Sequence, residues 1–194
     1  MHDHSWNSRL MPGAKNRTLG LVGFGGIGTE VAKRAVPFGM KVIYFCRHPN
    51  LADDAAYGVQ SVSMEELLKE SDYVVAAVPL TDQTFHLFNE ECIAQMKAGS
   101  VLINIARGPV VDEEALAQAL ASGHLGGCAV DVFPKEPCTD SVLTRYSNAL
   151  LTPHSATSTA ENSKATNFAA ANNLVNYLKK DIDAKYVVVQ GTRY

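Results

Sequence analysis

The stretch Thr18-Leu-Gly-Leu-Val-Gly-Phe-Gly-Gly-Ile-Gly28 decides the fold of this chain. It opens with an apolar run from Leu19 to Val22, interrupted by Gly20, which is typical of a buried parallel strand. The pattern G-x-G-x-x-G follows from Gly23 to Gly28, and residues 29–36 then show a helical pattern. A strand, a glycine loop and a helix in this order predict a dinucleotide-binding unit.

Each glycine of the loop has a physical role in that prediction. Gly23 lets the chain turn sharply off the strand, Gly25 lets a pyrophosphate approach the backbone, and Gly28 lets the helix pack close to the sheet. The helix N-terminus offers free N–H groups and the positive end of its dipole to phosphates. The alternative is a glycine-rich turn that binds no ligand.

Composition limits the class of protein. With 194 residues, 46% of them hydrophobic and 19% charged, the chain is expected to fold as one globular domain. A net charge of −3 gives no electrostatic reason to expect nucleic acid as a partner. No apolar run reaches membrane-spanning length, and residues 1–6 lack the pattern of a signal peptide, so we expect a cytoplasmic protein without a membrane partner.

The cysteines and histidines do not predict a metal centre. The four cysteines form no C-x-x-C pair and are expected to be reduced thiols. His2, Asp3 and His4 could ligate a metal, but a solvated tail is the simpler interpretation.

Apolar and helical patterns alternate along the rest of the chain. We expect strands at 19–22, 41–45, 73–78, 100–105, 126–130 and 149–151, and a further short strand within 57–62. Helices are expected at 29–36, 63–69, 89–96, 113–121 and 158–180, with a loop at 46–50 and a β-rich tail at 185–190. This alternation predicts an α/β fold with a doubly wound parallel sheet of the Rossmann type. The expected divisions are a lead-in at 1–17, the dinucleotide-binding domain at 18–157, and a C-terminal helix and tail at 158–194.

The loop after the second strand bears on the choice of cofactor. An NAD-binding fold usually places an acid there to hold the ribose 2′-hydroxyl. Here Cys46 takes that position, Arg47 and His48 follow, and no acid appears until Asp53. A guanidinium can bind a 2′-phosphate bidentately, so NADP(H) is favoured over NAD(H). The alternative is that Arg47 stacks on the adenine of NAD or faces solvent.

Polar residues also follow three later strands. Arg107 follows the fifth strand, Asp131 and Glu136 the sixth, and His154 the seventh. Because the carboxyl ends of parallel strands share one edge of a sheet, these groups can converge there. Any one of these residues alone is an ambiguous sign of function. Beside a dinucleotide site, however, the set supplies a group that binds anions, a carboxylate and a titratable imidazole.

At this point the chain resembles the D-isomer-specific 2-hydroxyacid dehydrogenases over nearly its whole length. The motifs that carry the resemblance are Leu21-Val-Gly-Phe-Gly-Gly-Ile-Gly28, Val78-Pro-Leu-Thr81, Gly99-Ser-Val-Leu-Ile-Asn-Ile-Ala-Arg-Gly108, Asp131-Val-Phe-Pro-Lys-Glu-Pro137 and Thr152-Pro-His154. Cys46-Arg-His-Pro49 is similar to the NADP(H)-using glyoxylate and hydroxypyruvate reductases of that family.

The resemblance implies a function and a set of residues. The family's catalytic Arg, Glu and His fall on Arg107, Glu136 and His154, which would bind the substrate carboxylate, orient the imidazole and transfer the proton to a small 2-keto acid. The residues expected to bind the cofactor are Gly23, Gly25, Gly26, Ile27, Gly28, Arg47, Val78, Pro79, Thr84, Ala106, Arg107, Asp131, His154 and Ala156.

The resemblance also implies what surrounds this domain. Family members carry a substrate domain whose larger part, on the order of a hundred residues, precedes the glycine loop. We therefore expect the substrate domain to be largely absent, turnover by this chain alone to be weak, and a homodimer to form through the cofactor domain. The alternative function is a dinucleotide-sensing module of the corepressor type. The identity of the 2-hydroxy acid is not predicted.

Overall fold

A computed structural model describes residues 13–49, 51–181 and 183. The chain divides into two units between Pro153 and His154, and each is described by itself. The His2-Asp3-His4 group and the predicted tail at 185–190 lie outside the described residues. The domain divisions drawn from the sequence stay predictions.

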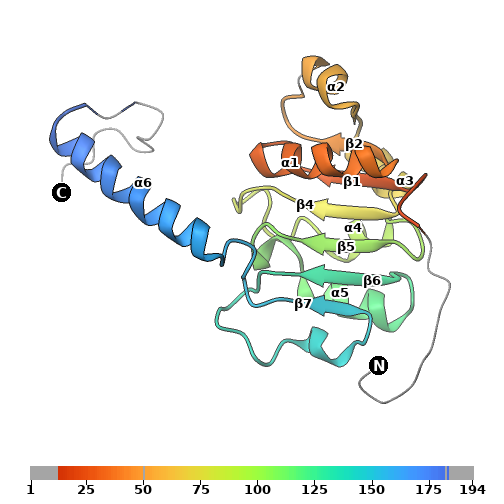
Figure 1. Cartoon of the computed structure of the whole chain (residues 1–194). Coiled ribbons are helices and arrows are strands. Elements are labelled where there is room, and N and C mark those ends of the chain that lie inside the picture. The colour runs from red at the N-terminus through yellow and green to blue at the C-terminus, as the bar shows by residue number, and fades with distance from the viewer. Residues whose placement is uncertain (1–12, 50, 182, 184–194) are drawn as a thin grey trace, which may run out of the picture. The chain divides into compact units, whose positions relative to one another are not determined.

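The first unit is built on a parallel sheet (Figure 1). In the described part of the chain its seven strands have the order β3-β2-β1-β4-β5-β6-β7, and every neighbouring pair is parallel. Their bounds are β1 Thr18–Val22, β2 Lys41–Phe45, β3 Gln60–Ser61, β4 Tyr73–Ala76, β5 Val101–Asn104, β6 Gly127–Val130 and β7 Ala149–Leu151. The order runs outward from β1 in both directions, which confirms the predicted doubly wound fold.

Helices follow most of the strands. The helices of this unit are α1 Gly26–Ala35, α2 Leu51–Tyr57, α3 Met64–Glu70, α4 Glu90–Ala94 and α5 Glu113–Ala121, with short 3-10 turns at η1 Val36–Phe38, η2 Gly108–Val110 and η3 Val142–Arg145. Three of these helices begin at a side-chain N-cap: Ser63 accepts from Glu66 N, Asn89 from Cys92 N, and Asp112 from Glu114 N and Ala115 N.

Two elements differ from the sequence prediction. Helix α1 begins at Gly26, three residues early, because the last glycines of the loop already form its first turn. Residues 51–57 form the unpredicted α2, whereas the short strand expected within 57–62 is present as Gln60–Ser61. Contacts distant in sequence support α2, since the Tyr44 hydroxyl donates to Asp54 over 2.7 Å and the ring of Phe24 meets that of Tyr57.

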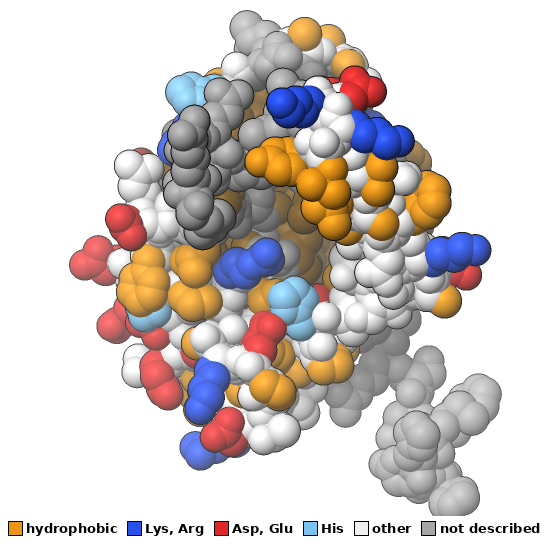
Figure 2. Space-filling view, turned by 90° about the vertical axis from the view of Figure 1, so that its left-hand side faces the viewer, with side chains coloured by type: hydrophobic (Ala, Val, Ile, Leu, Met, Phe, Trp, Pro, Cys, Tyr) orange, Lys and Arg blue, Asp and Glu red, His pale blue; other side chains and the backbone are white. Residues whose placement is uncertain are grey.

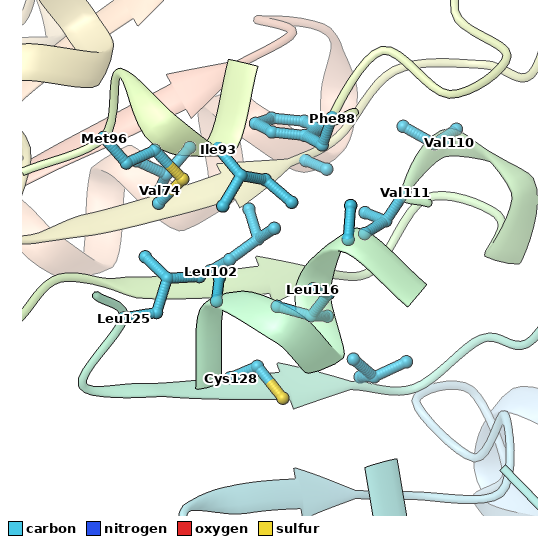
Figure 3. Packing of buried hydrophobic residues seen from close by; sticks show 14 of the residues in the cluster. Val74, Phe88, Ile93, Met96, Leu102, Val110, Val111, Leu116, Leu125 and Cys128 are labelled. Carbon is cyan, nitrogen blue, oxygen red and sulfur yellow. The ribbon is translucent and has the colours of Figure 1, made fainter. Parts of the chain in front are cut away.

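Alternating side chains of the strands pack on both faces of the sheet. Leu19 and Leu21 belong to one buried cluster together with Ala32 of α1. Val22 belongs to the larger cluster on the other face, part of which is shown in Figure 3. There Leu102 of β5 lies between helices α4 and α5, close to Ile93 and Leu116. Both faces of a parallel sheet are therefore buried, as the near-continuous apolar strands predict.

Gly20 explains how one helix packs on the sheet. A Cβ at this position would come within 2.8 Å of Leu67 Cγ on α3. The glycine in the middle of β1 therefore lets α3 lie directly on the strand.

The second unit contains α6, which spans Ala160–Leu178. Its N-cap is Thr159, whose side chain accepts from Asn162 N. The predicted helix at 158–180 is confirmed. Among the helices of the described residues, none is both long and apolar enough to cross a membrane.

Candidate functional site

The glycine loop joins β1 to α1 at the carboxyl edge of the sheet. Gly23 has φ +102°, a conformation that favours glycine, and a Cβ on it would collide with the carbonyl oxygen of Ala77. A Cβ on Gly28 would collide with the carbonyl oxygen of Gly23. These two glycines are thus required by contacts within the protein.

Gly25 and Gly26 are different, because a Cβ on either would meet no protein atom within 4 Å. Both are exposed, and Gly25 is the N-cap of α1 without any side-chain hydrogen bond to the helix. The first turn of α1 also contains no acidic residue. A small concave backbone surface beside uncapped helical N–H groups fits a pyrophosphate.

The end of β2 lies beside this loop, since Gly23 N donates to Phe45 O over 2.9 Å. Cys46 and Arg47 follow, and Arg47 is exposed, with Nη1 lying 3.5 Å from Gln83 Oε1. Asp54 accepts from the Tyr44 hydroxyl and, over 3.3 Å, from Ser61 N. Burial raises the pKa of Tyr44 to about 12, and the hydrogen bond to Asp54 acts in the same direction. Asp54 therefore has a structural role, because its carboxylate binds both Tyr44 and the backbone of Ser61.

A groove of about 440 Å³ lies next to the loop, in the first unit. It is lined by residues from the first turn of α1 and from the segments after β4 and β5: Ile27, Ala77, Val78, Pro79, Leu80, Ile105, Ala106 and Arg107. The segment after β4 is held by Thr84, whose hydroxyl donates to Pro79 O over 2.6 Å and accepts from Thr81 N over 2.7 Å. The groove thus brings together five of the residues predicted to bind cofactor, namely Ile27, Val78, Pro79, Ala106 and Arg107.

Arg107 lies on a turn that Asn104 holds in place. The Asn104 side chain donates to Arg107 O over 3.0 Å and accepts from Ala106 N over 3.1 Å. Asn104 is only 1% exposed, whereas Arg107 is exposed and donates from Nη1 to Ala106 O over 2.7 Å. The end of β5 therefore presents a cation on a rigid turn.

Gly108 brings this turn against the loop after β6. A Cβ on Gly108 would collide with the backbone of Phe133 and Pro134, so only glycine allows the approach. In that loop Glu136 is exposed, and its Oε1 accepts from Phe133 N over 2.9 Å. The segments that carry Arg107 and Glu136 are thus packed on each other.

Asp131 directly follows β6 and is 8% exposed. Its backbone N donates to Asn104 O over 3.1 Å, and its Oδ1 accepts from the Thr152 hydroxyl over 2.5 Å. Thr152 directly follows β7. The ends of three neighbouring strands are therefore joined at this edge, where the side chains of Asp131 and Thr152 meet.

His154 and Ala156 belong to the second unit, which begins at His154. His154 has φ +50° and is exposed. The predicted convergence of His154 with Arg107 and Glu136 stays a prediction.

The strand arrowheads in Figure 1 point toward the side of the molecule that faces the viewer in Figure 2. Basic, acidic and histidine side chains lie among hydrophobic ones on that side. Within the described residues, no cluster of histidine, cysteine and acidic side chains could hold a metal ion.

Two residues of this edge, Asn104 and Thr152, were not predicted to have a role. Both stand in motifs that carry the family resemblance; the Asn104 side chain holds the turn after β5, whereas the Thr152 hydroxyl joins the ends of β7 and β6. The available signal was the position of a polar side chain at the carboxyl end of a buried strand.

Comparison with known proteins agrees with this geometry. The sequence profile described as "D-isomer specific 2-hydroxyacid dehydrogenase, NAD binding domain" matches residues 1–156. The chain is 41% identical over 175 residues to a glyoxylate reductase of Thermococcus litoralis, covering 90% of this chain and 53% of that protein. It is 42% identical over 166 residues to a hydroxypyruvate reductase of Thermotoga maritima, covering 83% of this chain and 53% of that protein.

Solved structures show the same fold. A D-lactate dehydrogenase from Aquifex aeolicus, complexed with NAD and lactic acid, matches with a TM-score of 0.83 and 33% identity, over 93% of this chain and 59% of that one. An acyclic imino acid reductase in complex with NADPH and D-arginine matches with a TM-score of 0.80 and 30% identity, over 89% of this chain and 54% of that one. The chain spans about half the length of the curated relatives it matches.

Proposed function

Because the chain belongs to the D-isomer-specific 2-hydroxyacid dehydrogenase family and matches its NAD-binding domain, we propose that it binds a nicotinamide dinucleotide for the reduction of a small 2-keto acid. The names of its relatives, glyoxylate reductase and hydroxypyruvate reductase, suggest the size of that acid. The observation that carries the proposal is the glycine loop, where two glycines are required by the fold and two leave open space beside the uncapped N-terminus of α1.

The residues around the groove fit such a cofactor. Gly25 and Gly26 would hold the pyrophosphate, and the apolar groove beside Val78 and Ala106 would take a flat ring. Asp131, at the end of β6, is proposed to accept from the nicotinamide carboxamide. When bound, the cofactor supplies a hydride to C2 of the keto acid.

The remaining roles follow the family resemblance. Arg107 is proposed to bind the substrate carboxylate and polarise the keto oxygen, which its exposed position on a rigid turn supports. His154 is proposed to donate the proton to that oxygen, and Glu136 to orient the imidazole.

We further propose that the chain prefers NADPH. Arg47 is an exposed cation directly after β2, and Asp54 is engaged by Tyr44 and Ser61. A 2′-phosphate near Arg47 would gain a charge-assisted hydrogen bond without meeting that carboxylate.

Titration of the 194-residue chain with NADPH and NADH, followed by the fluorescence of the reduced nicotinamide, tests both proposals. NADPH is expected to bind more tightly. Arg47→Ala should weaken NADPH binding about tenfold, as expected for loss of one charge-assisted hydrogen bond, and leave NADH binding unchanged.

Arg145→Ala is the matched control, since Arg145 is an exposed arginine in the segment before β7. It should alter neither affinity. A clear preference for NADH in the unaltered chain would overturn the NADP proposal alone, whereas failure to bind either dinucleotide would overturn the proposed function.

A further inference from the structure

The hydroxyl of Thr152 makes a hydrogen bond that fixes one oxygen of Asp131. Thr152 Oγ1 donates to Asp131 Oδ1 over 2.5 Å, and the two residues follow neighbouring strands, β7 and β6. Thr152 N also donates to Val130 O over 3.0 Å, so the backbone of Thr152 is bonded to the residue before Asp131. The hydroxyl therefore reaches the carboxylate from a fixed backbone.

Asp131 is held from its other side as well. Its backbone N donates to Asn104 O over 3.1 Å, and the Asn104 side chain bonds the turn that carries Ala106 and Arg107. Ala106 and Arg107 line the groove. Asp131 is thus joined on one flank to a wall of the groove and on the other to Thr152, and it is 8% exposed.

A carboxylate that is mostly buried has few rotamers, and a hydrogen bond to one oxygen restricts them further. The hydrogen bond from Thr152 thus fixes the orientation of the Asp131 carboxylate, and a carboxylate is an acceptor for the N–H groups of a primary amide. The nicotinamide ring carries a primary amide, whereas the adenosine and pyrophosphate of the cofactor lie at the glycine loop in the proposed function.

We propose that Thr152 is a positioning residue that orients Asp131 for the carboxamide of the nicotinamide. This inference rests on the proposed function. It assigns Thr152 to one half of the cofactor only, so its loss should weaken binding of the nicotinamide half and spare the ADP-ribose half.

The test is calorimetric titration of the 194-residue chain with NADPH and with 2′-phospho-ADP-ribose, which lacks the nicotinamide. If the chain prefers NADH, the pair is NADH and ADP-ribose. Thr152→Val should raise the Kd of the dinucleotide about fivefold or more, the loss expected for one hydrogen bond, and leave that of the ADP-ribose ligand within about twofold. Thr152→Ser, which keeps the hydroxyl, should restore dinucleotide binding.

Thr144→Val is the matched control, because the Thr144 hydroxyl donates to Ser141 O over 2.7 Å in the segment before β7. It should change neither affinity. Equal weakening of both ligands by Thr152→Val would show a structural role and overturn the inference, as would an unchanged dinucleotide affinity or failure of Thr152→Ser to restore it. If the unaltered chain binds neither ligand, the proposed function fails; if it binds both and only the variants disagree, this inference alone fails.

Discussion

At the scale of single residues, some buried serine hydroxyls have hydrogen-bond partners within the described residues and others do not. Ser100 and Ser141 are both buried, at 3% and 7% exposure. Ser141 Oγ donates to Glu113 Oε1 over 2.6 Å and accepts from Leu143 N over 3.1 Å. Ser100 Oγ has no hydrogen-bond partner among the described residues. Because burial of an unpaired hydroxyl costs free energy, the same residue type should have opposite effects at these two positions.

Ser100→Ala is therefore expected to leave the free energy of unfolding unchanged or raise it by up to about 1 kcal/mol, since it removes an unpaired hydroxyl. Ser141→Ala is expected to lower it by about 1–2 kcal/mol, since it removes two hydrogen bonds. Urea denaturation of both variants measures the difference. A Ser100→Ala variant less stable than Ser141→Ala would contradict this assignment.

At the scale of elements, the amino ends of the strands carry an ion network opposite the candidate site. The Asp72 carboxylate, just before β4, accepts from Arg17 over 3.0 Å, from Lys97 over 2.7 Å and from Thr18 N over 2.9 Å. Burial alone would raise the pKa of Asp72, but the hydrogen bonds from Lys97, Thr18 and Arg17 outweigh it and lower that pKa. The network joins the starts of β1 and β4 to the segment before β5.

A lowered pKa in the folded state means that Asp72 stabilises the fold above its unfolded pKa and loses that effect as the pH falls through its folded pKa. Asp72→Asn should therefore lower the free energy of unfolding by on the order of 1 kcal/mol at pH 7. The difference from the unaltered chain should shrink as the pH falls below about 4.

Denaturation at a series of pH values measures this, with Glu70→Gln as control. Glu70 pairs over 2.6 Å with Lys41, but both side chains are largely exposed, so its loss should have little effect. A deficit in Asp72→Asn that stays constant down to pH 2 would refute the role of the charge.

The turn after β5 depends on one buried side chain. Asn104→Ala would leave Ala106 N and Arg107 O without their side-chain partner and should cost about 1–3 kcal/mol of stability. Asn148→Ala is the control, because Asn148 is exposed and donates to Gly126 O over 3.2 Å. It should lower the stability less than Asn104→Ala does. Thermal unfolding compares the two; equal stability of both variants would mean that Asn104 does not hold the turn.

The sequence was informative where a pattern is local. Apolar runs located the strands, and helical patterns located α3, α4 and α5, whose N-caps Ser63, Asn89 and Asp112 act within three residues. Helix α2 was missed because it has seven residues and is supported by the distant Tyr44 and Phe24. Its stability depends on tertiary packing, which no local pattern reports.

The same difference between local patterns and long-range contacts applies to the candidate site. The glycine spacing and the motif around Arg107 identified residues that the groove brings together. Asn104 was missed because the strand was predicted to continue to residue 105, whereas Thr152 was missed because its hydrogen bond to Asp131 depends on which strands are neighbours and on their register. Register follows from the whole sheet and is not set by any one strand.

At the scale of the whole molecule, the sheet separates two functions between its edges. The amino edge holds the Asp72 network, whereas the carboxyl edge holds the glycine loop, the groove and the polar residues of β5, β6 and β7. In a doubly wound sheet the ligand crevice lies where the strand order reverses, here between β1 and β4. The groove beside Ile27 and Ala77 lies at that point. We therefore propose that the glycine loop is shaped to hold a dinucleotide.

The most direct test is NADPH titration of Gly25→Ala together with its thermal unfolding. A Cβ on Gly25 meets no protein atom within 4 Å, so stability should change by less than about 0.5 kcal/mol, while a bound pyrophosphate would be displaced. Gly13→Ala, also in open space, is the control and should bind normally. We predict that Gly25→Ala keeps its melting temperature and loses at least about tenfold in NADPH affinity. An unchanged affinity in a folded Gly25→Ala chain would contradict the account.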